Sequence, residues 1–187
     1  MVLPPLSKER VVTEKVLLTG RPGCGKTTLI KRIVNNLPRR AGGFYTEEIR
    51  DGGTRSGFKI VTLDGEEVVF AHIDLKMPQY VGKYRLDLPA LERIGVGAVR
   101  QAVRSRRLVV IDEIGPMEIR SAIFRGAVNE ALDSEVPVLA TIFARSLPFT
   151  EAIKSRPDVM LIEVRFDNRE RLVSELADRI QAAVNPG

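Results

Sequence analysis

The chain has 187 residues, of which 44% are hydrophobic and 28% are charged, a balance typical of a soluble globular protein. Its apolar runs are too short to span a bilayer and residues 1–10 show no signal-peptide pattern, so we expect a cytoplasmic protein without a membrane segment. One cysteine excludes an intramolecular disulfide, and a formal charge of +5 from scattered basic residues fits a nucleotide or a nucleic acid equally well.

The first half of the chain combines a strand and a helix with a meander of strands. A buried strand is predicted over residues 15–19, and a helix over residues 26–36, which Pro38 ends. Strands predicted over residues 44–49, 57–62 and 68–71 are separated by Asp-Gly turn signals, which indicates an antiparallel hairpin insertion. Residues 74–83 are predicted to form a loop and residues 84–86 a short strand.

The second half alternates helices with apolar strands. Helices are predicted over residues 89–106, 117–132, 147–155 and 168–184, the last with Asp167 or Asn168 as its N-cap. Strands are predicted over residues 108–111, 137–142 and 159–164. This alternation predicts a single α/β domain over residues 1–187, with a mostly parallel, helix-covered sheet and a ligand site at the carboxyl ends of its strands.

Residues 20–27 fit the phosphate-loop pattern G-x-x-x-x-G-K-[ST], between a predicted strand and a predicted helix. Glycines let consecutive backbone N–H groups wrap a triphosphate, and the helix N-terminus adds partial positive charge. We expect Lys26 to reach the β and γ phosphates, the Thr27 hydroxyl to bind Mg²⁺ and Thr28 to lie at the α phosphate. The predicted nucleotide-binding residues here are Gly20, Arg21, Pro22, Gly23, Cys24, Gly25, Lys26, Thr27 and Thr28.

Two acids, Asp112 and Glu113, follow the apolar strand at residues 108–111. Adjacent carboxylates there would be costly in a core, and a cation at the strand tip removes that cost, so Asp112 is the second predicted Mg²⁺ ligand. We expect Glu113 to orient or deprotonate a water in line with the γ phosphate, because a kinase would have to exclude that water. Glu118 is either a further site residue or an acid in the first turn of a helix.

Other candidates are chosen by position. Four arginines could stabilise the transition state, and Arg145 is preferred because it follows the strand at residues 137–142. The other three are Arg21, Arg55 and Arg156. Strand alternation sends one of Glu47 and Glu48 toward the site. Thr141 could face the γ phosphate, and Asn168, with Arg169, could contact the base.

Four segments together resemble a known family: residues 20–28, Gly-Phe-Tyr-Thr-Glu-Glu at 43–48, Arg-x-Gly-Phe at 55–58 and Val-Ile-Asp-Glu-Ile-Gly-x-Met-Glu at 110–118. They are similar to the small thermostable nucleoside triphosphatases, the family of the cancer-related nucleoside triphosphatase. The resemblance implies a RecA-like or kinase-like P-loop fold and slow, Mg²⁺-dependent hydrolysis of ATP, GTP, CTP and UTP. It also carries nucleotide-binding positions onto Leu108, Val109, Val110, Ile111, Asp112, Glu113, Ile114 and Gly115.

Three functions therefore stay open at this point. The first is a nucleoside triphosphatase, favoured by Glu113 directly after Asp112. The second is a nucleotide, nucleoside or polynucleotide kinase, favoured by the small size of the chain and by the arginines between residues 145 and 156. The third is a nucleotide switch or nucleic-acid-associated module, favoured only by the basic charge. The expected partner is a nucleoside triphosphate, and the expected state is a monomer.

Overall fold

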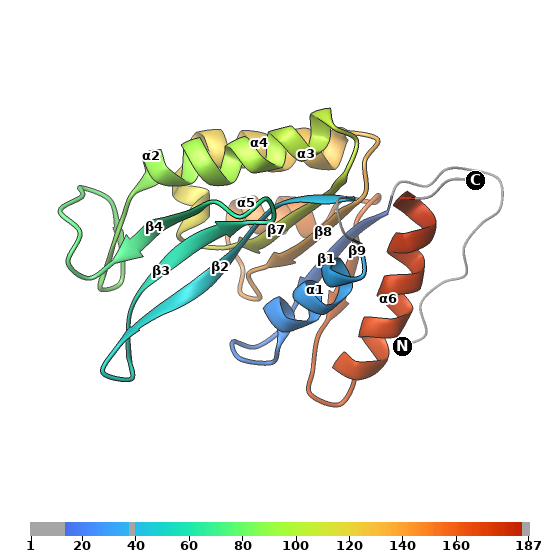
Figure 1. The fold of residues 1–187 in the computed structure, drawn as a ribbon, viewed down its shortest axis with the longest axis horizontal. Helices are drawn as coiled ribbons and strands as arrows, with labels where there is room; N and C mark the ends of the chain where they lie inside the picture. The colour runs from blue at the N-terminus through green and yellow to red at the C-terminus, as the bar shows by residue number, and fades with distance from the viewer. Residues whose placement is uncertain (1–13, 38–39, 185–187) are drawn as a thin grey trace.

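The computed structural model describes residues 14–37 and 40–184, which build one nine-stranded sheet with helices on both faces (Figure 1). The strand order is β5-β6-β4-β3-β2-β7-β8-β1-β9. Its parallel half contains β2 (Ala41–Asp51), β7 (Leu108–Ile114), β8 (Val138–Ile142), β1 (Lys15–Thr19) and β9 (Met160–Glu163). The antiparallel half adds β3 (Thr54–Thr62), β4 (Glu67–His72), β6 (Tyr84–Leu86) and β5 (Tyr80–Val81). The predicted α/β class, with antiparallel hairpin strands beside a helix-covered parallel sheet, is confirmed.

One strand, β8, separates β1, which leads into the predicted phosphate loop, from β7, which carries the two acids. Of the two arrangements that the sequence left open, this order is the RecA-like one. The order places β8 beside the acidic strand tip, so a side chain of β8 can reach Asp112 directly.

The two faces of the sheet carry two separate apolar cores. Helices α1 (Lys26–Asn35) and α6 (Arg169–Val184) cover one face, and α2 (Leu88–Ala90), α3 (Gly97–Arg104), α4 (Ala122–Asp133) and α5 (Pro148–Lys154) cover the other. Within β1 the side chains alternate, so Val16 and Leu18 pack under α1 and α6 while Leu17 packs in the other core. Burial of apolar surface on both faces holds the parallel strands in place. No helix of the described residues is long and apolar enough to cross a membrane.

Most predicted elements lie within a few residues of the observed ones, and the helix predicted over residues 117–132 is the clearest correction. That helix begins at Ala122, because the Ser121 hydroxyl accepts a hydrogen bond from Phe124 N at 3.0 Å and caps it. A short 3₁₀ turn, Glu118–Arg120, precedes it. Between α2 and α3 the predicted helix is continuous but π-helical at Leu91–Val96. Pro38 lies outside the described residues.

The predicted antiparallel hairpin joins the edge of the parallel sheet through β2. Strand β2 pairs with β7 through residues 41–45 and with β3 through residues 44–51, so its outer half projects beyond β7. Gly43 makes the close pairing possible: its φ is +109°, and a Cβ built there would lie 2.0 Å from Val110 O. The projecting half of the hairpin therefore flanks the carboxyl ends of the parallel strands.

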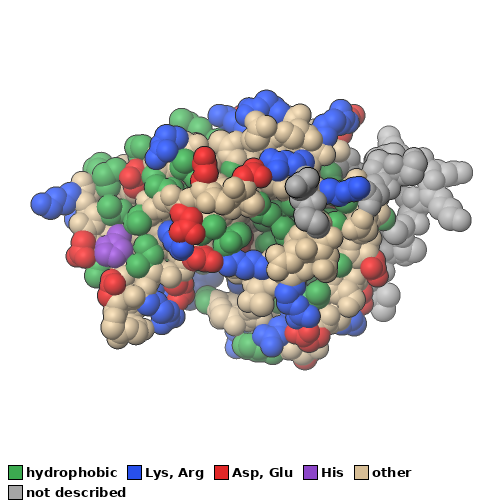
Figure 2. Space-filling model, viewed as in Figure 1, with side chains coloured by type: hydrophobic (Ala, Val, Ile, Leu, Met, Phe, Trp, Pro, Cys, Tyr) green, Lys and Arg blue, Asp and Glu red, His purple; other side chains and the backbone are tan. Residues whose placement is uncertain are grey.

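Charged side chains are mixed over the molecule. On the face drawn in Figure 2, Lys and Arg side chains are interspersed with Asp and Glu and form no continuous basic surface. This face offers no broad electrostatic footprint for a nucleic acid.

The buried Lys15 ties the start of β1 to the end of α4. Its ammonium donates to the carbonyls of Ala131 (3.1 Å), Ser134 (2.8 Å) and Val136 (2.5 Å). We predict that Lys15→Ala lowers the free energy of unfolding by about 2 kcal/mol or more, because buried carbonyls lose a charged donor. Urea denaturation measures this, with the exposed Lys76→Ala as control. Equal losses in the two variants would contradict it.

Candidate active site

The loops that follow the parallel strands meet at the lower edge of the molecule in Figure 1. A cleft of about 670 Å³ opens there between the phosphate loop, the tip of β7 and the projecting β2–β3 hairpin. It is lined by predicted site residues from both motifs, namely Pro22, Gly23, Gly25, Lys26, Thr27, Thr28, Asp112 and Glu113. The fold thus brings together residues about ninety positions apart in sequence.

The phosphate loop has the backbone that its glycines predict. The φ angles are +143° at Gly20, +79° at Gly23 and +98° at Gly25, and a Cβ at Gly20 would lie 2.5 Å from Val164 O. Gly25 is the N-cap of α1 and offers no capping side chain, so the first N–H groups of this helix remain available for an anion. Lys26 Nζ lies over the loop, donating to the carbonyls of Gly20 at 3.0 Å and Arg21 at 3.3 Å.

Cys24 points into the core under α1 and is 2% exposed. The buried space inside the loop therefore suits a small side chain at this position. Its thiol lies 3.1 Å from the Cβ position built at Gly20, so the loop folds around it.

Asp112 is 2% exposed at the tip of β7. Its Oδ1 accepts a hydrogen bond from the Thr141 hydroxyl of β8 at 2.5 Å, whereas its buried Oδ2 has no hydrogen-bond partner among the described residues. Burial raises the pKa of this carboxyl group, and the hydrogen bond from Thr141 and the nearby charge of Lys26 oppose that rise. Thr141 therefore orients the Asp112 carboxyl group, whereas the sequence suggested that Thr141 faces the γ phosphate.

Glu113 lines the same cleft as Asp112, although consecutive side chains of a regular strand face opposite sides of a sheet. The strand is irregular at this point: its register with β8 shifts between Ile111 and Ile114, so neither acid pairs with β8, while Asp112 still pairs with Tyr45 of β2. Burial raises the pKa of Glu113, the charge of Lys26 opposes that rise, and the charge of Asp112 adds to it.

Glu118 is buried in the same acidic group and also stands in the first turn of the 3₁₀ helix Glu118–Arg120, so both alternatives describe it. A Cβ atom built at Gly115 would lie 3.0 Å from Glu118 Oε2 and 3.4 Å from Glu113 Cδ. The carboxyl groups of Glu118 and Glu113 are therefore neighbours. Burial, together with the charge of Glu113, raises the pKa of Glu118 to about 8. Glu118 is consequently a neutral acid at pH 7, beside the carboxyl group of Glu113.

A second part of the cleft, about 840 Å³, lies on the far side of Lys26 and Glu113. Arg21, Glu118 and the predicted Arg145 line it, with Phe58, Met117 and Phe143 as its apolar wall. Among residues 14–37 and 40–184, no carboxylate forms an ion pair with the Arg145 guanidinium. Arg156 is different, because it is bound to Asp133 and Asp158, each at 2.8 Å.

The hairpin supplies two candidates that the sequence predicts, Glu48 and Arg55, and one that it does not, Arg50. Glu48 faces the cleft and forms ion pairs with two arginines. Its Oε2 lies 2.5 Å from Arg50 Nη2, and its Oε1 lies 2.8 Å from Arg55 Nη2. Glu47 faces away from the cleft, bonded to Lys31 at 2.8 Å and Lys59 at 3.3 Å. Alternation predicted the opposite directions of the two acids, but only the long-range pairing of β2 with β7 places the hairpin beside the phosphate loop.

Several predicted positions lie next to the cleft without lining it. The side chains of Leu108, Val109, Val110, Ile111 and Ile114 are at most 1% exposed and pack in the two cores, so they position the acids and do not reach a ligand. Gly115 begins the turn that brings Glu118 back. The side chain of Asn168 bonds to Arg165 N at 2.8 Å and Glu163 O at 2.9 Å, so it shapes the loop before α6 instead of facing a base.

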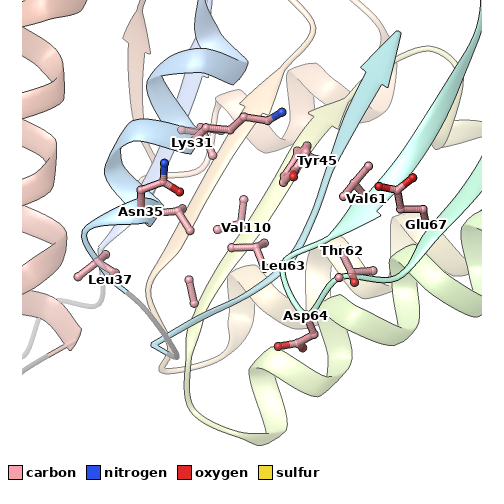
Figure 3. A pocket seen from close by; sticks show the side chains of 14 residues that line it. Lys31, Asn35, Leu37, Tyr45, Val61, Thr62, Leu63, Asp64, Glu67 and Val110 are labelled. Atoms are coloured by element: carbon pink, nitrogen blue, oxygen red, sulfur yellow. The ribbon is translucent and has the colours of Figure 1, made fainter. Parts of the chain in front are cut away.

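A separate groove of about 640 Å³ lies between α1 and strands β2 and β3 (Figure 3). Lys31 of α1 reaches across it to the Tyr45 ring, 3.9 Å from the centroid, while Val110 lies at its floor. It is lined by no residue of the phosphate loop and neither acid of β7, so we place the reaction chemistry in the other cleft.

Comparison with known proteins agrees with this geometry. A family model described as NTPase matches residues 15–177. Nucleoside-triphosphatase THEP1 of Thermotoga petrophila is 53% identical over 162 residues, 87% of this chain and 90% of that protein. The THEP1 protein of Thermofilum pendens is 44% identical over 180 residues, 93% of this chain and 99% of its own.

Two solved structures are similar to the whole arrangement. The crystal structure of THEP1 from the hyperthermophile Aquifex aeolicus has a TM-score of 0.83 at 36% identity and covers 89% of this chain and 99% of its own. The solution structure of a human cancer-related nucleoside triphosphatase has a TM-score of 0.77 at 36% identity and covers 91% of this chain and 98% of its own. The fold is therefore that of the P-loop nucleoside triphosphatases.

The buried acid Glu118 makes stability depend on pH. Because its pKa is about 8 in the folded protein and 4.5 ordinarily, the native state keeps a proton that the unfolded state releases between these values. Its burial therefore costs up to about 1.4 kcal/mol of stability per pH unit as the pH rises. We predict that Glu118→Gln is more stable than the wild type, by a margin that grows from pH 5 to pH 8.

Thermal unfolding without nucleotide or Mg²⁺ measures this margin, with the exposed Glu66→Gln as control. Parallel stability curves for the wild type and Glu118→Gln would show that Glu118 carries no retained proton.

Proposed function

Because this chain belongs to the NTPase family and is a nucleoside triphosphatase, we propose that it hydrolyses Mg²⁺-bound ATP, GTP, CTP and UTP to the nucleoside diphosphate and phosphate. The observation that carries the proposal is the pair of carboxyl groups at the tip of β7, lining one cleft with Lys26 and Thr27. A cytoplasmic location and a monomeric state stay predictions.

The donors around Asp112 fit a hard cation. The buried Oδ2 of Asp112 has no hydrogen-bond partner within the described part of the chain, and Thr27 adds a hydroxyl in the same cleft. Those residues contain no group of three or more His, Cys, Asp or Glu that could hold a metal alone, and Mg²⁺ suits such a site because phosphate oxygens and water complete its shell. Thr27 and Asp112 would hold the ion, which supplies positive charge to the reacting phosphates when bound.

The remaining chemistry belongs to the residues around the phosphates. The phosphate-loop N–H groups and Lys26 bind the triphosphate and offset the charge that builds up in the transition state. Glu113 orients the attacking water and accepts its proton, and its burial makes it a stronger base than a free carboxylate. Arg145, which forms no ion pair with the described residues, approaches the γ phosphate from the neighbouring part of the cleft.

The large space beyond Glu113 supports a second candidate, phosphoryl transfer to an organic acceptor. About 840 Å³ with an apolar wall at Phe58, Met117 and Phe143 is far more than one attacking water requires. A nucleoside or the end of a polynucleotide would fit the space, with Glu113 as the base for its hydroxyl group.

We predict that phosphate is released from all four triphosphates without any acceptor, and that Glu113→Gln lowers kcat at least about tenfold with little change in KM. Arg145→Ala lowers kcat in the same assay. The assay follows Mg²⁺-dependent phosphate release, with Glu66→Gln as control. A second arm follows transfer of labelled γ phosphate to added nucleosides and oligonucleotides.

No phosphate release by the wild type, combined with label transfer to an acceptor, would replace the hydrolase with the kinase. An unaffected Glu113→Gln would remove Glu113 from the mechanism while leaving hydrolysis itself in place.

A further inference from the structure

The loop between β9 and α6 carries an exposed aromatic ring beside the phosphate loop. Phe166 is 71% exposed, the largest value among the exposed large hydrophobic side chains of the described chain. The loop follows a parallel strand and lies at the edge of the sheet where the phosphate loop lies, since Val164 O would touch a Cβ built at Gly20 at 2.5 Å. Phe166 belongs to neither apolar core, so its ring is open to contact with a ligand.

Arg169 connects this ring to the phosphate loop. Its Nη1 and Cδ lie 3.4 and 3.6 Å from the Cβ position built at Gly25, and its guanidinium carbon lies 5.7 Å from the centroid of the Phe166 ring. Arg169 therefore lies between the phosphate loop and the Phe166 ring. A small pocket of about 130 Å³ between α1 and α6, lined by Gly25, Thr28 and Arg169, opens beside them.

The polar groups next to this pocket are already bonded to each other. Arg32 Nη1 donates to both carboxylate oxygens of Glu170, at 2.9 and 2.8 Å, and Asn168 is bonded to the backbone of its own loop. These groups are poorly placed to read the hydrogen-bonding edge of a base. Arg169 Nε is also paired with Glu170 Oε1, at 3.5 Å, but such a pair occupies the edge of a guanidinium and leaves its plane free to stack. An aromatic ring and a guanidinium plane stack on any base, because every base has a π-face.

We propose that Phe166 and Arg169 form a stacking platform for the nucleobase of the bound triphosphate. The proposal rests on the proposed hydrolase function and explains its tolerance of different bases: the phosphate loop supplies most of the affinity, and the platform adds a contribution without selecting among bases. Both purines and pyrimidines stack in this way, because each has a π-face.

Kinetics of Phe166→Ala test the platform. KM for ATP, GTP, CTP and UTP is expected to rise about fivefold or more, the loss typical of one base–aromatic stack, without a matching fall in kcat. Inhibition by tripolyphosphate, which has no base, is expected to stay within about twofold of the wild type, since the phosphate loop alone supplies that binding. Ile123→Ala, which removes another exposed apolar side chain, from α4, is the control.

Binding can be followed separately from hydrolysis, because the chain has no tryptophan. Phe166→Trp keeps the platform and adds a single fluorophore, whose emission is expected to change with ATP and GTP but not with tripolyphosphate. An unchanged KM in Phe166→Ala, or the same tryptophan response to tripolyphosphate as to ATP, would overturn the platform. Neither result would touch the hydrolase proposal, which fails only if the wild type releases no phosphate.

Discussion

The architecture of this protein depends on one buried carboxylate. Asp112 is 2% exposed at the end of an apolar strand, with one oxygen bound by Thr141 and the other without a partner among the described residues. Desolvating a carboxylate is costly unless a charge or hydrogen bonds compensate it. Burial of Asp112 therefore destabilises the free protein, and a cation beside its Oδ2 would relieve that cost.

The sheet order delivers the compensating groups. Because β8 lies between β7 and β1, Thr141 reaches Asp112 from one side, while α1 brings Lys26 and Thr27 from beyond β8. The irregular register after Ile111 turns Glu113 into the same cleft. Strand β2 passes the end of β7 and sets two further arginines, paired to Glu48, against the phosphate loop. The cleft is thus assembled from loops at one edge of a rigid sheet, as is typical of parallel α/β folds.

Local patterns in the sequence predict much of this and miss what is long-range. The phosphate loop and the two acids of β7 are each a short continuous segment of unusual composition, so the sequence alone predicts them. The Asp-Gly turn signals predict the hairpin, but no local pattern shows that the bare backbone at Gly43 lets β2 pair with β7. For Glu118 the sequence leaves two alternatives, since nothing in its neighbours reveals that the turn at Gly115 brings it next to Glu113. The position of Asn168 after the last strand predicts a contact with the base, but its side chain accepts a hydrogen bond from Arg165 N within the loop. The exposed side chain in this loop is Phe166.

The most direct test of the role of the buried Asp112 charge compares the thermal stability of the wild type and Asp112→Asn at pH 8, alone and with Mg²⁺ plus a non-hydrolysable triphosphate. Asparagine keeps the shape of the aspartate side chain and can still accept the hydrogen bond from the Thr141 hydroxyl, but it removes the buried negative charge. The account predicts that the free variant melts at a higher temperature than the free wild type and gains little from Mg²⁺ and nucleotide, whereas the wild type gains strongly. A variant that is less stable alone, yet is stabilised by Mg²⁺ and nucleotide as much as the wild type, would contradict it.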